Sequence, residues 1–288
     1  MTTAAASSSL TVPPTSADRV RQVVVLLGSL LAAGAAAYGS GAFGGQAIQD
    51  AAGGALSATA TPVAPDNPAF RIWSVIYLGL FVFAVLQVLP RNAADPRLRA
   101  TAWWVLASMV LNAAWIGVVQ AGSLAGSVVV IAALLAVLAV LVVRLVRAAP
   151  SSTAQALLLD GTVGLYTGWV SVATLANVAA ALADAGLGEL GLGATGWSVV
   201  VVVLAAALAA AWAAFAGRRR AVALGIALAM SWGLAWVAVG RFAGPLEDTT
   251  VAWAAAVASA VALGAGLVAV LRRRGVRARP VPAPLSPS

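Results

Sequence analysis

The chain has 288 residues, of which 62% are hydrophobic and 9% are charged, and its formal net charge is +8. Soluble domains carry about 25% charged residues, so this composition predicts an integral membrane protein without a separate soluble domain. All 17 basic residues are Arg, and the chain contains no Lys, His or Cys. These absences exclude disulfides, imidazole or thiolate metal sites, His- or Cys-ligated haem, retinal Schiff bases and His-dependent nucleophilic catalysis.

We expect a disordered segment rich in Ser, Thr, Ala and Pro over residues 1–19. Eight apolar stretches follow it, each long enough to cross a bilayer as a helix. They cover about residues 22–39, 71–90, 101–120, 124–143, 157–183, 197–216, 221–241 and 250–271. A basic, Pro-rich tail follows at residues 272–288. The predicted fold is therefore all-α, a polytopic membrane helix bundle.

The distribution of Arg predicts the orientation of this bundle. With the N-terminus in the cytoplasm, 15 of the 17 Arg residues fall on the cytoplasmic side, and only Arg71 and Arg241 fall outside. Cytoplasmic loops of membrane proteins carry an excess of basic residues. We therefore expect a multi-pass protein of a bacterial plasma membrane with both termini in the cytoplasm. Alternatively, Arg19, Arg21 and the apolar run after them form a cleaved secretory signal, which would leave seven spans.

Two of the predicted outer loops are substantial, at residues 40–70 and 184–196. The first is rich in Gly and Pro and is long for a connection between helices. Long loops of this kind are either lids over a site or mobile linkers, and the sequence leaves both interpretations open.

Three of the predicted spans place large aromatic and amide side chains on single helical faces. All lie in the outer half of the bilayer, beneath the first outer loop. Trp and Tyr provide flat apolar walls, and Asn supplies hydrogen bonds that orient a ligand. The positions are Trp73 and Tyr77 in the second span, Asn112 and Trp115 in the third, and Tyr166, Trp169 and Asn177 in the fifth.

This set predicts a pocket for a planar, mostly apolar ligand such as a tetrapyrrole or a sterol. The alternative is that the Trp residues anchor the helices at the membrane interface and that the Asn residues bond neighbouring helices. Because three spans converge on one region, the sequence gives equal weight to the pocket and to this alternative, and both remain open.

The fifth span also carries small and charged residues inside the membrane. Gly164 and Gly168 form a G-x-x-x-G motif, which lets helices approach closely, either within the monomer or in a homodimer. Asp160 is the one carboxylate within a predicted span and lies near its cytoplasmic edge. We interpret it as an interfacial residue paired with Arg147.

The seven polar and aromatic positions resemble the signature of the TspO/MBR family, the tryptophan-rich sensory or translocator proteins. In that family, the second helix carries Trp followed four residues later by Tyr, and the third carries Leu-Asn-x-x-Trp. The fifth carries Tyr-x-x-Trp, with Asn eight residues after the Trp. The matching residues are Trp73 and Tyr77; Leu111, Asn112 and Trp115; and Tyr166, Trp169 and Asn177.

The resemblance implies a five-helix core over residues 20–183 with a ligand pocket beneath its first loop. It implies that Trp73 and Trp169 contact the ligand and that Asn112 and Trp115 form pocket walls. Family members bind porphyrins and sterol-like ligands, often as homodimers. Residues 184–271 have no counterpart in this resemblance, and we expect them to form an additional segment of three membrane helices.

The predicted function is a membrane ligand-binding or sensory protein, with no catalytic residues, no metal and no covalently bound cofactor. Its expected partners are the lipid bilayer, a hydrophobic small molecule (a porphyrin or a sterol-like compound) and a second copy of the chain, but not nucleic acid. A transporter of such a molecule is the alternative, although the sequence has no clear inverted repeat and no Pro in the interior of a span. The family also suggests an enzyme that acts on bound porphyrin through tryptophan photochemistry.

Overall fold

The computed structural model describes residues 13–41, 44, 46–187 and 191–276. Within these ranges the regular structure is entirely helical, and eight helices are long and apolar enough to cross a membrane. This confirms the predicted all-α bundle of eight spans. The long helices are α1 (Ser16–Gly39), α2 (Ile72–Val88), α3 (Pro96–Gln120), α4 (Leu124–Arg147), α6 (Thr162–Asp184), α7 (Gly193–Ala216), α8 (Arg220–Ala243) and α9 (Thr249–Val276).

Short helical turns complete the architecture. The 3₁₀ turns η1 (Ala52–Gly54) and η2 (Asn67–Arg71) lie in the connection between α1 and α2, and η3 (Pro90–Asn92) follows α2. The single turn α5 (Thr153–Gln155) and the π-helical turn η4 (Ala156–Gly161) lead directly into α6.

The first helix begins earlier than predicted. Thr15 caps α1 in a reciprocal arrangement, because its hydroxyl accepts from the Asp18 amide while the Asp18 carboxylate accepts from the Thr15 amide. Such a capping box satisfies two amide donors that a helix start otherwise leaves unpaired. The expected disordered segment over residues 1–19 therefore extends too far, since α1 starts at Ser16; residues 1–12 lie outside the described part of the chain.

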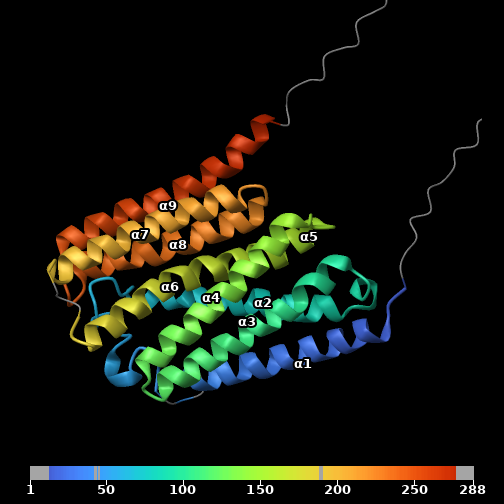
Figure 1. Cartoon of the computed structure of the whole chain (residues 1–288), viewed down its shortest axis with the longest axis horizontal. Coiled ribbons are helices and arrows are strands. Elements are labelled where there is room, and N and C mark those ends of the chain that lie inside the picture. Colours follow the sequence, from blue (N-terminus) through green and yellow to red (C-terminus); the bar gives the residue numbers. More distant parts are fainter. Residues whose placement is uncertain (1–12, 42–43, 45, 188–190, 277–288) are drawn as a thin grey trace, which may run out of the picture.

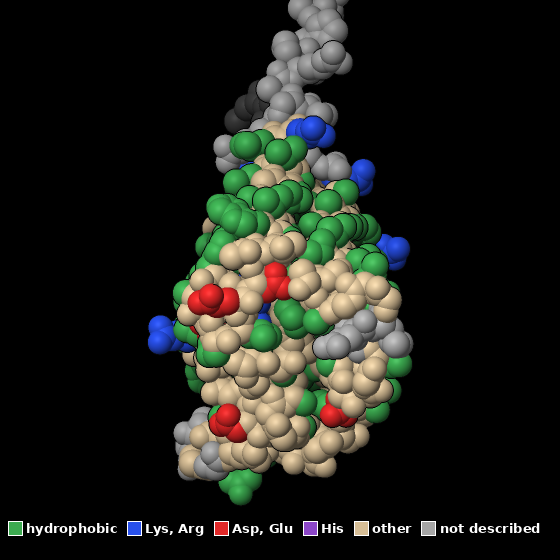
Figure 2. Space-filling model, turned by 90° about the vertical axis from the view of Figure 1, so that its left-hand side faces the viewer, with side chains coloured by type: hydrophobic (Ala, Val, Ile, Leu, Met, Phe, Trp, Pro, Cys, Tyr) green, Lys and Arg blue, Asp and Glu red, His purple; other side chains and the backbone are tan. Residues whose placement is uncertain are grey.

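The helices run along the long axis of the molecule, and α1 begins at the same end at which α9 terminates (Figure 1). We call this the Arg-rich end, because the short connections there contain Arg91, Arg218 and Arg219. The opposite end, the loop end, holds the long connection between α1 and α2 and the connections that precede α7 and α9. Figure 2 views the loop end, where acidic side chains lie on the surface.

The packing order makes α8 the central helix of the C-terminal half. Helix α1 packs on α3, α3 on α4 and α4 on α6, while α8 packs on both α6 and α9, and α7 packs on α9. In the most apolar 18-residue stretch of each helix, 61% of the residues are buried in α8, against 28% in both α7 and α9. The last three helices are therefore joined to the first five chiefly through α8 and α6.

Close approach of α6 and α8 depends on glycine. A Cβ atom on Gly164 would lie 2.5 Å from the carbonyl oxygen of Val222, and one on Gly225 would lie 2.7 Å from that of Gly161. Gly168 faces Ile226 in the same way. The G-x-x-x-G motif of the fifth span is thus covered by α8 of the same chain, as the interpretation of packing within the monomer predicts.

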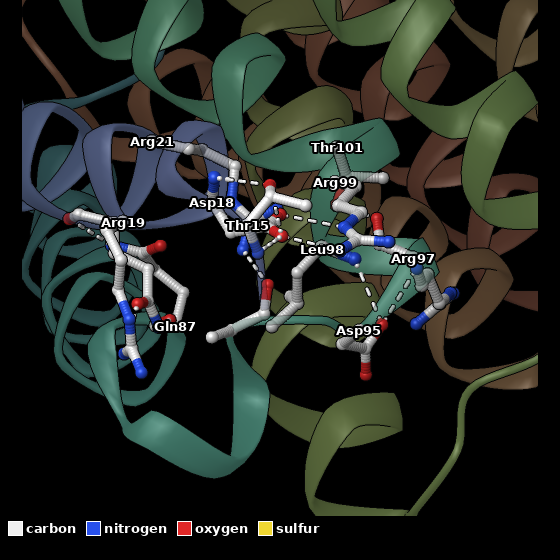
Figure 3. Close-up of polar contacts among 12 residues, drawn as sticks. Thr15, Asp18, Arg19, Arg21, Gln87, Asp95, Arg97, Leu98, Arg99 and Thr101 are labelled. Atoms are coloured by element: carbon white, nitrogen blue, oxygen red, sulfur yellow. Dashed lines mark hydrogen bonds and ion pairs between the residues drawn. The ribbon is translucent and has the colours of Figure 1, made fainter. Parts of the chain in front are cut away.

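A network of charged side chains joins α1 to α3 at the Arg-rich end (Figure 3). The buried carboxylate of Asp18 accepts from Arg21 at 3.0 Å and from two nitrogens of Arg99 at 2.5 and 2.7 Å. Asp95 caps α3 by accepting from the amides of Arg97 and Leu98. The carboxylates of Asp18 and Asp95 therefore serve in helix capping and in pairing between helices.

The structure corrects the predicted partner of Asp160. Its carboxylate lies in the π-helical turn η4, is buried, and accepts from the buried guanidinium of Arg97 at 2.6 Å. Arg147, the expected partner, is exposed at the end of α4. Arg97 lies near the start of α3 and turns toward η4, and it also donates to the carbonyl oxygen of Leu145 in the last turn of α4. The pair therefore lies inside the bundle rather than at the interface.

Candidate ligand-binding site

All seven predicted residues meet in one region, where α2, α3 and α6 face each other below the loop end. The indole of Trp73 stacks on the ring of Tyr77, with centroids 5.3 Å apart. It meets Tyr166 edge-on at 5.7 Å and Trp169 edge-on at 6.3 Å. Trp73 and Tyr77 are half-buried, whereas Tyr166 and Trp169 are buried. Trp73 is therefore the centre of an aromatic cluster formed by two helices.

Phe70 belongs to this cluster, although the sequence pattern did not single it out. It lies in η2, directly before α2, and its ring meets Trp169 edge-on at 5.7 Å. Its position three residues before Trp73 places it on the same helical face. That spacing was a usable signal, but the expected start of the second span at residue 71 left Phe70 in the loop.

The two Asn residues bond neighbouring helices. Asn112 donates to the Tyr77 hydroxyl at 2.7 Å, which joins α3 to α2. Trp115 donates its indole N–H to Asn177 Oδ1 at 2.9 Å, and Asn177 donates to the hydroxyl of Ser127 on α4 at 2.9 Å. Ser127 was not predicted to take part. These are the contacts that the interhelical interpretation of the Asn residues expects, each worth about 1 kcal/mol.

Two polar atoms of the cluster nevertheless have no hydrogen-bond partner within the described part of the chain. They are the indole N–H of Trp169, a donor, and Oδ1 of Asn112, an acceptor, and both are buried. Both residues line a cavity of about 20 Å³ between α2, α3, α4 and α6. A cavity of this size holds about one water-sized group. Since buried polar atoms are normally paired, these two unpaired atoms mark the region as a candidate site.

A second cavity of about 50 Å³ lies directly beneath the connection between α1 and α2. The connection supplies its roof through residues such as Ile48, Leu56 and Pro65, and Trp115 and Trp169 contribute to its floor. Sites for drug-sized ligands measure about 300–1,000 Å³. The volume of the cavity beneath the loop is therefore several times smaller than the volume that a large planar ligand needs.

Arg241 holds the roof in place. Its side chain is 1% exposed, and it donates to the carbonyl oxygens of Ala58 at 2.7 Å and Thr61 at 3.3 Å. The sequence placed Arg241 at the outer edge of its span without a partner. Hydrogen bonds from a charged donor are stronger than neutral ones, so α8 fixes the middle of the loop.

The end of the loop is held by α8 as well. The indole of Trp232 donates to the carbonyl oxygen of Ala69 at 2.9 Å, and the amide of Asp66 donates to the carbonyl oxygen of Trp236 at 3.3 Å. Ala69 is completely buried. The loop therefore packs as an ordered cover over the aromatic cluster, which favours a lid over a mobile linker.

The comparisons with known proteins give one family. The sequence model of the family described as TSPO-like protein matches residues 22–268. No curated protein and no solved structure matches the chain. The match includes α7, α8 and most of α9, so the expectation that these helices have no family counterpart is wrong. With nearly the whole helical bundle covered by that match, the chain belongs to the TSPO-like family.

Proposed function

We propose that the chain is a membrane receptor for a planar, mostly apolar molecule, and that its aromatic cluster receives this molecule beneath the loop between α1 and α2. Family membership indicates a membrane ligand-binding or transport protein. The finer assignment rests on one observation: Trp169 and Asn112, which carry an unpaired N–H and an unpaired Oδ1, line the same small cavity as the rings of Phe70 and Trp73. Flat walls with a few convergent polar groups are typical of ligand sites.

A tetrapyrrole is the ligand class we propose first, with a sterol-like compound second. Either is far larger than the cavity of about 50 Å³ beneath the loop. Binding must therefore lift the loop from the cluster and break its hydrogen bonds to Arg241 and Trp232. Affinity for the ligand is reduced by the free energy of this opening.

The test is a titration of the full-length chain, in lipid nanodiscs, with protoporphyrin IX, followed by the absorbance of the porphyrin. Trp169→Phe keeps an aromatic ring and removes the unpaired N–H; loss of one hydrogen bond weakens binding by about fivefold. Trp73→Phe reduces the flat surface and also weakens binding. Trp253→Phe is the matched control, because Trp253 is 65% exposed on α9.

Unchanged affinity in both Trp73→Phe and Trp169→Phe would overturn the site. Competition by cholesterol distinguishes the sterol-like class from the tetrapyrrole class. Uptake of the porphyrin into sealed vesicles, beyond what binding accounts for, would instead favour a transporter.

We also propose that the Arg-rich end faces the cytoplasm of a bacterial cell. The support is the basic bias of that end, where the connections carry Arg91, Arg218 and Arg219, against an acidic loop end. Because the chain contains no Cys, single Cys variants provide the test. We expect a membrane-impermeant maleimide to label Thr250→Cys in intact cells but not Ser151→Cys, and the reverse pattern would refute the orientation.

A further inference from the structure

A larger cavity lies at the Arg-rich end, at the opposite end of the bundle from the loop that covers the aromatic cluster. It measures about 440 Å³ and is bounded by the end of α2 and η3 on one side and by α5 and η4 on the other. We call it the α2–α5 cavity. Its volume lies within the range of small-molecule sites, about 300–1,000 Å³. The receptor site proposed above makes no use of this cavity.

The cavity is apolar inside and polar at its mouth. Phe83 and Leu159, which line it from α2 and η4, are buried. Arg91, Ser151 and Ser152 also line it and are exposed. The two apolar residues belong to membrane-spanning segments, whereas Arg91 directly follows the span that ends at Val88. The cavity therefore reaches from the apolar interior to the level at which the chain leaves the membrane.

Hydrogen bonds fix the wall that α5 contributes. The side-chain oxygen of Gln155 accepts from the Ser151 amide at 2.9 Å and from Arg97 at 3.3 Å, and its Nε2 donates to Asp95 at 3.1 Å. Asp160, in the adjoining turn η4, is paired with the same Arg97. The carboxylates next to this wall are thus already bonded within the protein. A π-helical turn such as η4 is also frequent at functional sites.

Arg91 gives the cavity its charge. No carboxylate is among the described residues that line it. The guanidinium of Arg91 is exposed and makes no hydrogen bond or ion pair with any residue that the structure describes. Ser152, beside it in the lining, accepts from the Gln155 amide at 3.1 Å and keeps its O–H for another acceptor. A guanidinium binds a phosphate through parallel hydrogen bonds, so the mouth is suited to a phosphate group.

The elements that border the cavity also carry apolar side chains on their outer surface. Val85 in α2 and Leu157 in η4 are exposed within membrane-spanning segments. A lipid reaches the cavity by diffusion in the membrane, with its acyl chains already in apolar surroundings. A soluble phosphate compound, by contrast, would leave the apolar inner wall uncovered. An amphipathic anion from the membrane fits both parts of the cavity.

We propose that the α2–α5 cavity binds one anionic phospholipid from the leaflet at the Arg-rich end. Its phosphate lies on Arg91 and Ser152, and an acyl chain lies against Phe83 and Leu159. Basic pockets between membrane helices near the membrane surface bind anionic headgroups. The site goes beyond the proposed receptor function and does not rest on it, because the two sites lie at opposite ends of the bundle.

The test is the protection of an introduced thiol, since the chain contains no Cys. Ala154 is exposed and lines the cavity, so the rate at which N-ethylmaleimide labels Ala154→Cys in detergent micelles reports occupancy. Ala17→Cys, exposed at the start of α1 at the same end and outside the wall, is the matched control. The probe is dioleoylphosphatidylglycerol. Separate arms use dioleoylphosphatidylcholine, which has the same chains, and glycerophosphate, which has none.

We expect the phosphatidylglycerol to slow labelling of Ala154→Cys saturably and to leave Ala17→Cys unaffected. The zwitterionic lipid should need a concentration about fivefold higher. In the Ala154→Cys background, Arg91→Gln should raise the half-protecting concentration of phosphatidylglycerol about fivefold, as loss of one basic residue at a membrane surface predicts. Arg91→Lys keeps the charge and most of the protection. Arg218→Gln removes an exposed charge from the same end, outside the wall, and should change nothing.

The outcomes separate the parts of the proposal. Absence of slowing in Ala154→Cys, or equal slowing in Ala17→Cys, overturns the site. Equal half-protecting concentrations for the two lipids, or for Arg91→Gln and the parent, overturn the role of the charge. Protection by glycerophosphate at the concentrations that suffice for phosphatidylglycerol overturns the membrane as the source of the ligand.

Discussion

Replacing Arg241 by Met tests whether α8 holds the loop closed over the aromatic cluster. The buried guanidinium donates to Ala58 at 2.7 Å and to Thr61 at 3.3 Å. Hydrogen bonds to charged groups are worth about 1.5–3 kcal/mol each, and the longer bond belongs at the weak end, so the closed loop should lose about 3 kcal/mol. Met retains an apolar side chain of similar reach and removes a charge whose burial costs several kcal/mol. The helices should therefore keep most of their stability.

Hydrogen exchange measured by mass spectrometry on the full chain in nanodiscs separates the loop from the helices. A loss of about 3 kcal/mol corresponds to about 100-fold faster exchange where opening limits exchange. The reporting amides are those bonded within the loop, including Ser57 to Gly54 and Ala64 to Thr61. Arg71→Met is the control, because Arg71 is exposed at the same end. Unchanged exchange in the loop, or an equal increase in all helices, would refute the anchoring role.

Two further predictions concern the stability of the bundle, measured as the midpoint of thermal unfolding in detergent. Asp160→Asn leaves the buried Arg97 without its carboxylate and should cost about 3–5 kcal/mol; adding Arg97→Met should recover most of the loss, and no recovery would contradict the pairing. Gly168→Val places a side chain against Ile226 of α8 and should cost about 1–3 kcal/mol. Gly34→Val, where a Cβ meets nothing within 4 Å, is the control, and equal losses in both would argue against a close α6–α8 contact.

The number and type of the membrane helices could be predicted because they depend on the length of apolar runs. The helix boundaries depend on local chemistry that hydropathy does not register. The capping box of Thr15 and Asp18 extends α1 toward the N-terminus, and the π-helical turn at Ala156–Gly161 extends the fifth span backward to Thr153. That turn carries Asp160, whose partner Arg97 is 63 residues away in sequence. No local pattern encodes such a pairing.

The convergence of the seven predicted residues could be foreseen because their spacing fixes a helical face and the spans alternate in direction. What could not be predicted is how the loop lies on them. The burial of Arg241 and the size of the closed cavity both follow from the packing of the loop against α8. In sequence, Arg241 looks like any basic residue at the edge of a span. Its role emerges only when residues 58 and 61 are brought beside it.

A five-helix core over residues 20–183, taken without α8, would lose several of the contacts that shape the aromatic cluster and its cover. Without α8, the glycine face of Gly164 and Gly168 would lose the helix that covers it. The loop would lose its bonds to Trp232 and Arg241. The first five helices supply the aromatic surface, whereas α8 holds the loop that closes it. If the ligand enters beneath the loop, as we propose, its entry depends on contacts outside the segment that carries the recognisable motifs, so substitutions in α8 should alter the rate of binding more than the chemistry of recognition.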